Sequence, residues 1–379
     1  MGFQSLLIFL AGSLLPSFVL ALVATYIVRA NAGRFGLIDL PSERKVHTTP
    51  TPRGGGLAVW LGVMGTFAAA QLVLWSVPRS GSIENLVPEF ARPHIAGAAA
   101  KAGELWILLA AGTVLMLLGL ADDRRGLSWQ FRLVVEVVVA AVCVWLVPNL
   151  RLTAFIPFPL VTEALSVLWI VVLINAFNML DNMDGLSAGV AAIASAILAA
   201  VMLMSPDPLT GQPQLFKAGL LLVLVGAVLG FLWHNRPPAT IFMGDSGSYF
   251  IGFMIAAATL LASYTGYNSP QRHAILAPIL VMAVPLYDMA TVIVIRLRSG
   301  KSPFAADKNH FSHRLVDLGL TKPQAVLTIY LTTATCGLGA LLLHRVDATG
   351  ALLIILLIGC VLGLIAILES TARRTIRRD

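Results

Sequence analysis

The sequence predicts an all-α, polytopic integral membrane protein with about 11 transmembrane helices. Of its 379 residues, 58% are hydrophobic and only 12% are charged, whereas soluble domains carry about 25% charged residues. Apolar runs of roughly 17–25 residues are long enough to cross about 30 Å of hydrocarbon as helices. The runs found here lie at residues 5–28, 55–77, 105–121, 131–148, 163–180, 186–204, 215–234, 247–267, 274–295, 324–344 and 350–369.

Lys and Arg are distributed unevenly between the two sets of connecting segments. If the N-terminus is outside the cell, 19 of the 26 Lys and Arg residues fall on the cytoplasmic side. Cytoplasmic loops carry such an excess of positive charge, so we expect an external N-terminus, a cytoplasmic C-terminus and location in the inner (plasma) membrane. The net charge of +7 then reflects topology and the anionic lipid surface, and it does not imply nucleic-acid binding.

Five short polar segments hold most of the reactive side chains, and the span count places all of them on the cytoplasmic side. Polar groups that converge on one membrane face are typical of an enzyme whose substrate is held in that membrane. Because no linker separates the spans, we expect residues 1–379 to form a single integral membrane domain. The five segments are residues 39–56, 122–132, 175–185, 236–248 and 296–322.

The third polar segment carries oxygen ligands at a helical spacing and contains no Lys or Arg. Asn175, Asn178 and Asp181 are three residues apart, so they share one helix face, and Asp184 continues the spacing if the helix extends. Oxygen ligands of this kind suit Mg²⁺, which takes one or two protein groups together with substrate phosphate. A simple Asn/Asp cap at the end of the helix is the alternative.

The fourth segment reads Gly244-Asp245-Ser246-Gly247 before an apolar run. The glycines permit close backbone approach, and the following helix would offer free N–H groups to an anion. Asp245 alone would also be explained as the N-cap of that helix. Beside Asn178 and Asp181, a site for a metal and a diphosphate becomes the better interpretation.

The second segment begins with two adjacent carboxylates, Asp122 and Asp123, followed by Arg124 and Arg125. This pattern suits an orienting group beside cations that bind phosphate, and a solvated cluster at the membrane edge is the alternative. Since successive helical residues point about 100° apart, the two carboxylates should not share one task.

The fifth segment is basic and carries His310, His313 and Arg314. These groups could bind a diphosphate, although the usual excess of cytoplasmic positive charge explains the cations as well. Zinc is disfavoured because no Cys lies nearby and the spacing of the histidines differs from that of common zinc helices. The first segment, residues 39–56, is an irregular basic loop that by itself indicates only a cytoplasmic location.

Two ionisable residues, Glu136 and Asp288, fall inside predicted spans, and Pro278 and Pro285 predict a kink in the same span as Asp288. Intramembrane carboxylates usually face the bundle interior, where each forms either an internal ion pair or part of a functional site. They keep a polytopic transporter as an alternative from another class, although transporters gather such groups near the bilayer midplane.

Taken together, the motifs resemble those of the polyprenyl-phosphate N-acetylhexosamine-1-phosphate transferases. The resemblance spans residues 39–318 and rests on pieces that occur in family order: ERKVH with TPRGGG, ADD, NAFNMLDNMDGLSAG, GDSGSYFIG, and PLYDM with DKNHFSHRL. It implies transfer of a sugar 1-phosphate from a UDP-N-acetylhexosamine to undecaprenyl phosphate at the cytoplasmic face, with release of UMP. Membrane lipid is a further partner, and a homodimer is compatible with the pattern.

The resemblance also implies a role for each candidate site residue. It assigns Mg²⁺, which Mn²⁺ can replace, to Asn178 and Asp245. It places Asp122 and Asp123 near the lipid phosphate, and Asp181 and Asp184 near the reacting centre. The remaining assignments are His310 and His313 to catalysis, and Lys45, Arg53, Asn175, Arg124, Arg125 and Arg314 to substrate binding.

One departure bears on the donor. Relatives often have two or three clustered histidines, whereas here only His310 and His313 are present. This disfavours the phospho-muramoyl-pentapeptide branch, which stays as the alternative within the family, and favours N-acetylglucosamine 1-phosphate. We therefore expect an enzyme that initiates the synthesis of a cell-envelope polysaccharide.

Overall fold

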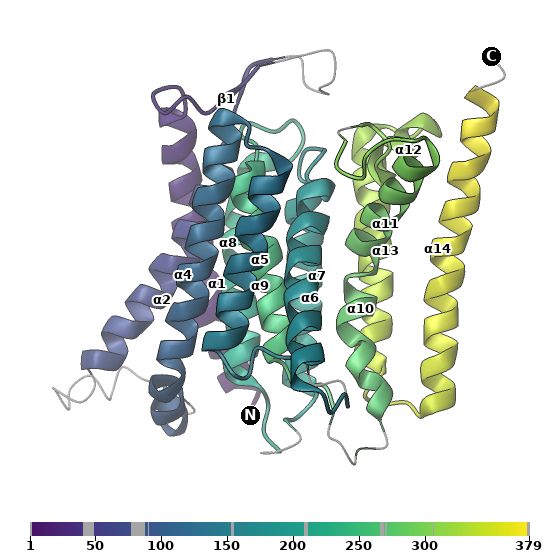
Figure 1. The fold of residues 1–379 in the computed structure, drawn as a ribbon. Helices are drawn as coiled ribbons and strands as arrows, with labels where there is room; N and C mark the ends of the chain where they lie inside the picture. Colours follow the sequence, from purple (N-terminus) through teal and green to yellow (C-terminus); the bar gives the residue numbers. More distant parts are fainter. Residues whose placement is uncertain are drawn as a thin grey trace.

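The structure, a computed structural model, is a bundle of long helices with one short two-stranded ribbon (Figure 1). It describes residues 2–40, 49–76, 88–89, 91–152, 155–207, 211–265, 269, 271–305 and 307–376. Nine helices in this part are long and apolar enough to cross a membrane, and a bent pair makes a tenth. The predicted class, a polytopic helical membrane protein, is confirmed.

Each of the eleven predicted apolar runs overlaps a helix in the part of the chain that the structure describes. The correspondence is closest at residues 186–204, where the predicted and observed bounds agree. The long helices are α1 (Phe3–Asn31), α2 (Gly55–Ser76), α4 (Ile95–Arg125), α5 (Trp129–Leu146), α6 (Pro159–Leu180), α7 (Leu186–Met204), α8 (Leu215–Asn235), α9 (Gly244–Leu261), α11 (Ala283–Arg298), α13 (Lys322–Leu342) and α14 (Ala348–Ile376). The short elements are β1 (Ile38–Asp39), β2 (Thr51–Pro52), α10 (Ala277–Val281), α12 (Phe311–Asp317) and the 3₁₀ turns Arg92–His94 and Arg272–Leu276.

Helix α4 is longer than the apolar run at residues 105–121 that predicted it. Its extra N-terminal turns are rich in Ala, which favours helix without making the segment strongly apolar. The helix ends at Gly126, which adopts a left-handed conformation (φ 64°) and donates its N–H to the Asp122 carbonyl at 2.8 Å.

The predicted kink near Pro278 and Pro285 is confirmed as a sharp bend. The segments 272–281 and 283–298 meet at 64° around Met282. Pro285 lies in the first turn of α11, where its missing N–H costs least. The bend lets α11 pack on α6 while α10 packs on α13.

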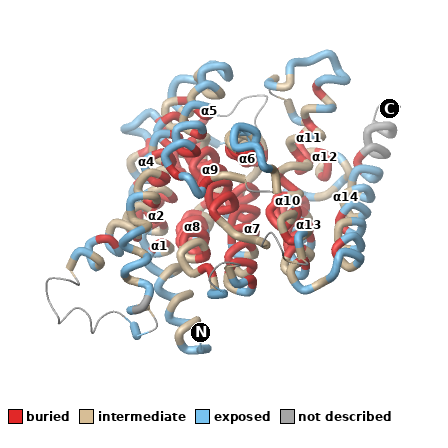
Figure 2. The backbone as a smooth tube through the Cα atoms, turned by 60° about the horizontal axis from the view of Figure 1, so that its bottom comes forward, coloured by how far each residue is buried: buried red, intermediate tan, exposed pale blue. Residues whose placement is uncertain are grey.

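Helix α9 is the central helix of the bundle, and it is not among those apolar enough to count as a span by composition. Every residue from Ser246 to Leu261 is buried, because α4, α6, α2 and α8 surround the helix (Figure 2). At Gly252 an added Cβ would lie 2.7 Å from the Ile174 Cα on α6, so the two backbones are in direct contact. A helix shielded in this way can carry polar residues in its first turn.

The two termini lie at opposite ends of the bundle (Figure 1). The ribbon β1–β2 and helix α12 lie at the same end as the C-terminus. The assignment of this end of the bundle to the cytoplasmic side is a prediction from the distribution of Lys and Arg in the sequence.

Candidate active site

A cavity of about 820 Å³ opens at the end of the bundle that carries the ribbon and α12. All five polar segments contribute to its wall, so the convergence expected from the span count is present in the structure. The ionisable side chains that line it are Asp39, Arg53, Asp123, Asp181, Asp184, Asp245, Asp307, Lys308, His310, His313 and Lys322.

Main-chain hydrogen bonds join the first polar segment to the fourth. The Phe242 N–H donates to the Pro52 carbonyl at 2.8 Å, and the Gly55 N–H donates to the Phe242 carbonyl at 3.0 Å. Arg53 lies between these bonds and forms an ion pair with Asp39 at 2.5 Å. The described end of this basic loop, residues 49–56, is therefore fixed at the cavity by backbone pairing.

Two glycines allow neighbouring helices to touch the first turn of α9. A Cβ added at Gly56 would lie 2.0 Å from the Gly247 nitrogen, and one at Gly119 would lie 2.4 Å from the Asp245 carbonyl carbon. Real side chains do not approach backbone atoms so closely, so only glycine fits either position. These contacts place the end of α4, which carries Asp123, beside the start of α9.

Asp123 caps α9 from outside that helix. Its carboxylate accepts the N–H groups of Asp245 at 3.1 Å and Ser246 at 3.3 Å. The sequence suggested either that Asp245 caps α9 or that the N–H groups of its first turn are free to bind an anion. Both expectations are wrong for the Asp245 and Ser246 N–H groups, because Asp123 accepts them. Met243 occupies the N-cap position and provides no side-chain bond, because the cap comes from α4.

The predicted metal-binding pair is in direct contact. The Asn178 Nδ2 donates to the Asp245 Oδ1 at 2.7 Å and to the Ser248 Oγ at 3.2 Å. Since α6 ends at Leu180, the helical spacing does not continue to Asp184. Instead, Asp184 lies in the turn that follows and accepts the Ala239 N–H at 2.9 Å.

The sequence left open whether Asp181 caps a helix or contributes to a site. In the structure it does both, since it occupies the C-cap position of α6 and its side chain lines the cavity. The pKa of Asp181 is raised to about 7, chiefly by burial, with the negative charge of Asp123 adding to the rise and the positive charge of Arg53 opposing it.

The residues present fit a divalent cation that is completed by a phosphate ligand. Within the described residues, Asp123, Asp181 and Asp184 have no Lys, Arg or His side chain within 4.0 Å. Among the described residues, no three His, Cys, Asp or Glu side chains are placed so that they could hold a metal ion by themselves. Uncompensated carboxylates without a closed protein cage are what Mg²⁺ typically uses when substrate phosphate supplies further ligands.

Asp122 turns away from the cavity, as the angle between adjacent helical residues predicts. Its carboxylate accepts the Leu127 N–H at 2.6 Å and the Tyr249 hydroxyl at 3.4 Å, and it pairs closely with Arg132. Arg132 also lies 3.6 Å from the Asp245 Oδ2. Sequence reasoning missed this role of Arg132, although its place in the first turn of α5, after the ADD motif, was a usable signal.

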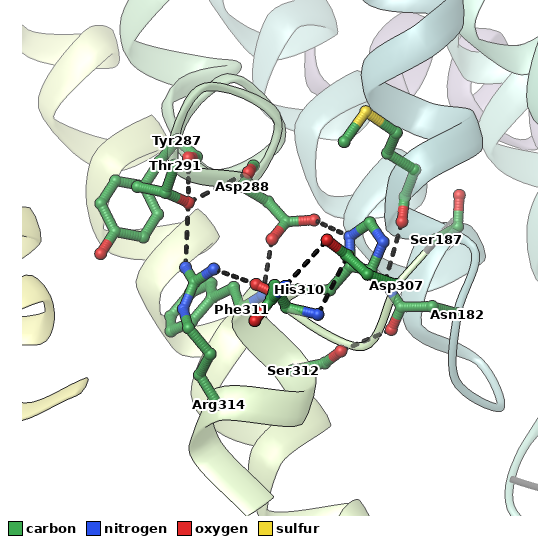
Figure 3. Close-up of polar contacts among 12 residues, drawn as sticks. Asn182, Ser187, Tyr287, Asp288, Thr291, Asp307, His310, Phe311, Ser312 and Arg314 are labelled. Carbon is green, nitrogen blue, oxygen red and sulfur yellow. Dashed lines mark hydrogen bonds and ion pairs between the residues drawn. The ribbon is translucent and has the colours of Figure 1, made fainter. Parts of the chain in front are cut away.

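The histidine segment, residues 296–314, is held by a buried contact between α11 and the start of α12 (Figure 3). The Nδ1 of His310 lies 3.0 Å from the Asp288 Oδ2, and the Phe311 N–H donates to the Asp288 Oδ1 at 2.5 Å. The His313 ring lies 6.3 Å from the His310 ring, centre to centre. Burial lowers the pKa of His313, and the neighbouring His310 lowers it further.

Arg296 forms its ion pair with Asp307, in the loop between α11 and α12, and not with Asp288. Its guanidinium donates to both carboxylate oxygens of Asp307, at 3.1 and 3.2 Å, and to the Pro303 carbonyl at 2.6 Å. Burial acts to raise the pKa of Asp307, but hydrogen bonds from Arg296 and Asn309 outweigh it and hold the pKa at about 2. This ion pair fixes the loop that leads to His310.

Several predicted substrate-binding residues lie outside the cavity wall. Arg314 is buried and donates to Glu369 on α14 at 2.8 Å. It also donates to Thr291 on α11 at 3.0 Å (Figure 3). Asn175 donates to Glu136 at 2.5 Å, so the partner of that intramembrane carboxylate is an amide and not a cation. Arg124 and Arg125 are exposed at the end of α4, and Lys45 lies outside the described residues.

Comparisons with known proteins identify the family of this chain. The sequence profile of glycosyl transferase family 4 matches residues 105–263. The chain is 36% identical over 348 residues to a decaprenyl-phosphate N-acetylglucosaminephosphotransferase of Mycobacterium tuberculosis, covering 86% of this chain and 80% of that protein.

Two further relatives come from other bacteria. The chain is 31% identical over 359 residues to a "Probable undecaprenyl-phosphate N-acetylglucosaminyl 1-phosphate transferase" of Bacillus subtilis, covering 92% and 89% of the two chains. It is 28% identical over 336 residues to an undecaprenyl-phosphate alpha-N-acetylglucosaminyl 1-phosphate transferase of Escherichia coli O157:H7, covering 85% and 80%. These relatives are transferases, which favours an enzyme over the transporter alternative. The chain belongs to glycosyl transferase family 4, as a multi-pass membrane phosphotransferase of the polyprenyl-phosphate N-acetylhexosamine-1-phosphate transferase type.

Proposed function

We propose that this enzyme transfers N-acetylglucosamine 1-phosphate from UDP-N-acetylglucosamine to undecaprenyl phosphate at the cytoplasmic face of the plasma membrane. The products are a lipid-diphosphate-linked sugar, the first intermediate of a cell-envelope polysaccharide, and UMP. The observation that carries the proposal is one cavity lined by two unlike sets of groups, at the bundle end to which the sequence assigns most Lys and Arg residues. Carboxylates without a cation within 4.0 Å, namely Asp123, Asp181 and Asp184, form one set, and Lys308, His310 and His313 form the other.

The reaction is a displacement at phosphorus. An oxygen of the lipid phosphate forms a bond to the β-phosphorus of the donor, the bond from that phosphorus to the UMP oxygen breaks, and UMP leaves with the electron pair. A phosphate monoester has its second pKa near 6, so the attacking group is already mostly a dianion at pH 7. It needs positioning and charge neutralisation more than a base.

The acidic wall would hold the metal. Asn178 and Asp245 are the ligands we propose for Mg²⁺, or for Mn²⁺ in its place, with Asp123 and Asp181 close enough to add negative charge. When bound, the ion neutralises charge on the diphosphate and polarises the bond to the leaving group. Because Asp123 already accepts two N–H groups of α9, its main task is to hold Asp245 in position.

The basic and imidazole groups of the lining would bind the donor diphosphate. Arg53, His310 and His313 reach the cavity from different elements and can donate to phosphate oxygens. We place Lys45 in the same group by its position in the first polar segment. Arg314 acts differently in our proposal, since its contacts with Thr291 and Glu369 hold α12 in place.

The test is UMP release by the purified protein in detergent, with Mg²⁺, undecaprenyl phosphate and a panel of donors. We expect UDP-N-acetylglucosamine to support the highest kcat/KM, above UDP-N-acetylgalactosamine and UDP-N-acetylmuramoyl-pentapeptide. Asp245→Ala protein is the control for contaminating activity. A preference for the muramoyl donor would support the family alternative, and no UMP release with any of these donors would contradict the proposed reaction.

A further inference from the structure

Asp288 is a buried carboxylate that touches the cavity only through another residue. Its side chain is 0% exposed, and it is absent from the cavity wall, whereas His310 belongs to that wall. Both carboxylate oxygens are engaged: Oδ2 faces the His310 Nδ1 at 3.0 Å and Oδ1 accepts the Phe311 N–H at 2.5 Å (Figure 3). A carboxylate held at two points has one orientation, and it imposes that orientation on the ring.

We propose that Asp288 is a positioning residue for His310 and that it fixes which ring nitrogen faces the substrate. An ionised carboxylate only accepts hydrogen bonds, so the Nδ1 of His310 must carry a proton toward Asp288. The other ring nitrogen, Nε2, is then directed to the part of the ring surface that lines the cavity. A carboxylate that sets the tautomer and orientation of a neighbouring imidazole is a recurrent arrangement in catalytic sites.

This inference rests on the proposed function, in which His310 donates a hydrogen bond to the diphosphate of the UDP-sugar. With Nδ1–H committed to Asp288, Nε2 donates to a phosphate oxygen when the ring carries its second proton as well. The nearest counter-charge for that cation is the Asp288 carboxylate itself. Other ionisable groups share the cavity with His310 and contribute to its field. They are His313 on α12, Lys308 and Asp307 in the preceding loop, Lys322 on α13, and Asp181 and Asp184 after α6.

A purely structural role would need only one of the two contacts. To hold the start of α12, Asp288 requires no more than the bond from the Phe311 N–H. The contact with the ring adds a constraint on a side chain that is itself part of the cavity wall. Asp288 is also 22 residues from His310 in the chain, so the pair connects two separate elements.

Asp288→Asn separates these roles. The Phe311 N–H still requires an acceptor, so the amide oxygen stays in the Oδ1 position and the amide NH₂ faces Nδ1 of His310. Nδ1 then accepts and Nε2 carries the only proton, which inverts the ring state while the start of α12 remains bonded. We expect kcat to fall about 10–100-fold, as is typical when a partner that orients a functional histidine is changed. The KM for UDP-N-acetylglucosamine should stay within about twofold of its original value.

Two controls accompany this variant. Ser299→Ala, at the exposed end of α11, removes only a hydroxyl that donates to the Ile295 carbonyl of the same helix, so its kcat should stay within about twofold of wild type. His310→Gln completes a double-mutant cycle with Asp288→Asn. If Asp288 acts through His310, the double variant should be no slower than His310→Gln alone.

Nitrogen NMR of ¹⁵N-histidine-labelled protein provides a readout that does not depend on turnover. In the wild-type protein, the His310 signals, assigned by their loss in His310→Gln, should show a protonated Nδ1, and in Asp288→Asn they should show an unprotonated Nδ1. The wild-type measurement stands even if Asp288→Asn fails to fold. An unprotonated Nδ1 in wild type, a normal kcat in Asp288→Asn, or multiplicative losses in the double variant would each overturn the proposal.

Failure of the proposed donor is a separate result. If the wild-type enzyme uses another UDP-sugar, the kinetic comparison is made with that sugar, and the same outcomes decide the role of Asp288. A wild-type enzyme that uses UDP-N-acetylglucosamine together with an Asp288→Asn enzyme of equal kcat would leave the proposed function intact and remove only this inference.

Discussion

The two walls of the cavity are held in place by different kinds of contact. We call Asp123, Asp181 and Asp245 the acidic corner, and residues 296–314 the histidine segment. The acidic corner is set by backbone packing, because glycines bring the helices to within direct contact of the first turn of α9. The histidine segment is set by buried side-chain pairs between separate elements, namely Asp288 with His310, Arg296 with Asp307, and Arg314 with Glu369.

This difference determines how each wall responds to change. Backbone contacts cannot adjust to an added side chain without moving a whole helix, so the acidic corner should fail abruptly. A buried pair can lose one contact while the others remain, so the histidine segment should lose function in steps. The acidic corner therefore gives a fixed site for a metal and a phosphate, and the histidine segment gives a wall that substitutions can adjust.

The largest effect of a substitution outside the cavity lining should come from Gly56→Ala. The added methyl group would lie 2.0 Å from the Gly247 nitrogen and must displace the start of α9. We expect UMP release to fall at least about 100-fold, which is the order of loss for a displacement of about 1 Å at a reacting centre. Initial rates and the thermal unfolding temperature of the same purified protein check this.

Gly97→Ala is the matched control for that substitution. Gly97 lies in α4 with nothing within 4 Å of its added Cβ, so the same chemical change meets open space. We expect full activity and unchanged or slightly higher stability, because Ala is the better helix former. If both variants behave alike, backbone packing does not position the acidic corner.

A second contrast should appear between the activities of the Asp245 and Asp122 variants, two carboxylates of the same region. Asp245→Ala should abolish UMP release, since this carboxylate lines the cavity beside Asn178. Asp122→Asn should slow turnover only partially, roughly tenfold, because Asp122 faces Arg132 and loses about 1.5 kcal/mol of a charged hydrogen bond. Equal and complete loss in both variants, at normal expression, would instead support a base role for Asp122.

The smallest effect should appear in the histidine segment as a pH-dependent loss of stability in Asp307→Asn. The native pKa of Asp307 is about 2, below the ordinary value near 3.9, so ionised Asp307 favours the folded state. That contribution is complete above about pH 4 and is lost as the pH falls through 2.

The unfolding temperature of Asp307→Asn should therefore lie a few degrees below that of wild type at pH 7 and pH 5, and the gap should narrow below pH 4. Glu163→Gln, which removes a half-exposed carboxylate 3.5 Å from Arg151, serves as the surface control and should show little change. A gap that persists unchanged at the lowest pH at which the protein still folds would show that the Arg296–Asp307 pair is not its origin.

The sequence predicted the helices and the position of the site well. Apolar length located every span, and counting spans brought the five polar segments to one end, because a helix that crosses a bilayer has no other place for its flanking residues. The spacing of Asn178 and Asp181 also identified the acidic corner. Asp184 was placed correctly at the cavity but for the wrong reason, since α6 ends before it.

The pairings within the site could not be read from the sequence. Asp288 contacts His310 rather than the nearer Arg296, and Arg314 is turned inward to Glu369. These contacts depend on how α11 bends and where α14 packs, which local periodicity does not encode. The identity of the α9 cap was missed for the same reason, because Asp123 reaches it from a helix more than a hundred residues earlier.

The burial of α9 has a consequence for how the protein is made. The helices that enclose it, α2, α4, α6 and α8, all precede it in the chain. Translation therefore delivers the walls of the enclosure before the central helix emerges. Because every residue of α9 from Ser246 to Leu261 is buried among these helices, its neighbours in the finished bundle are protein surfaces rather than lipid. The helix that carries Asp245 is therefore synthesised after the helices that enclose it.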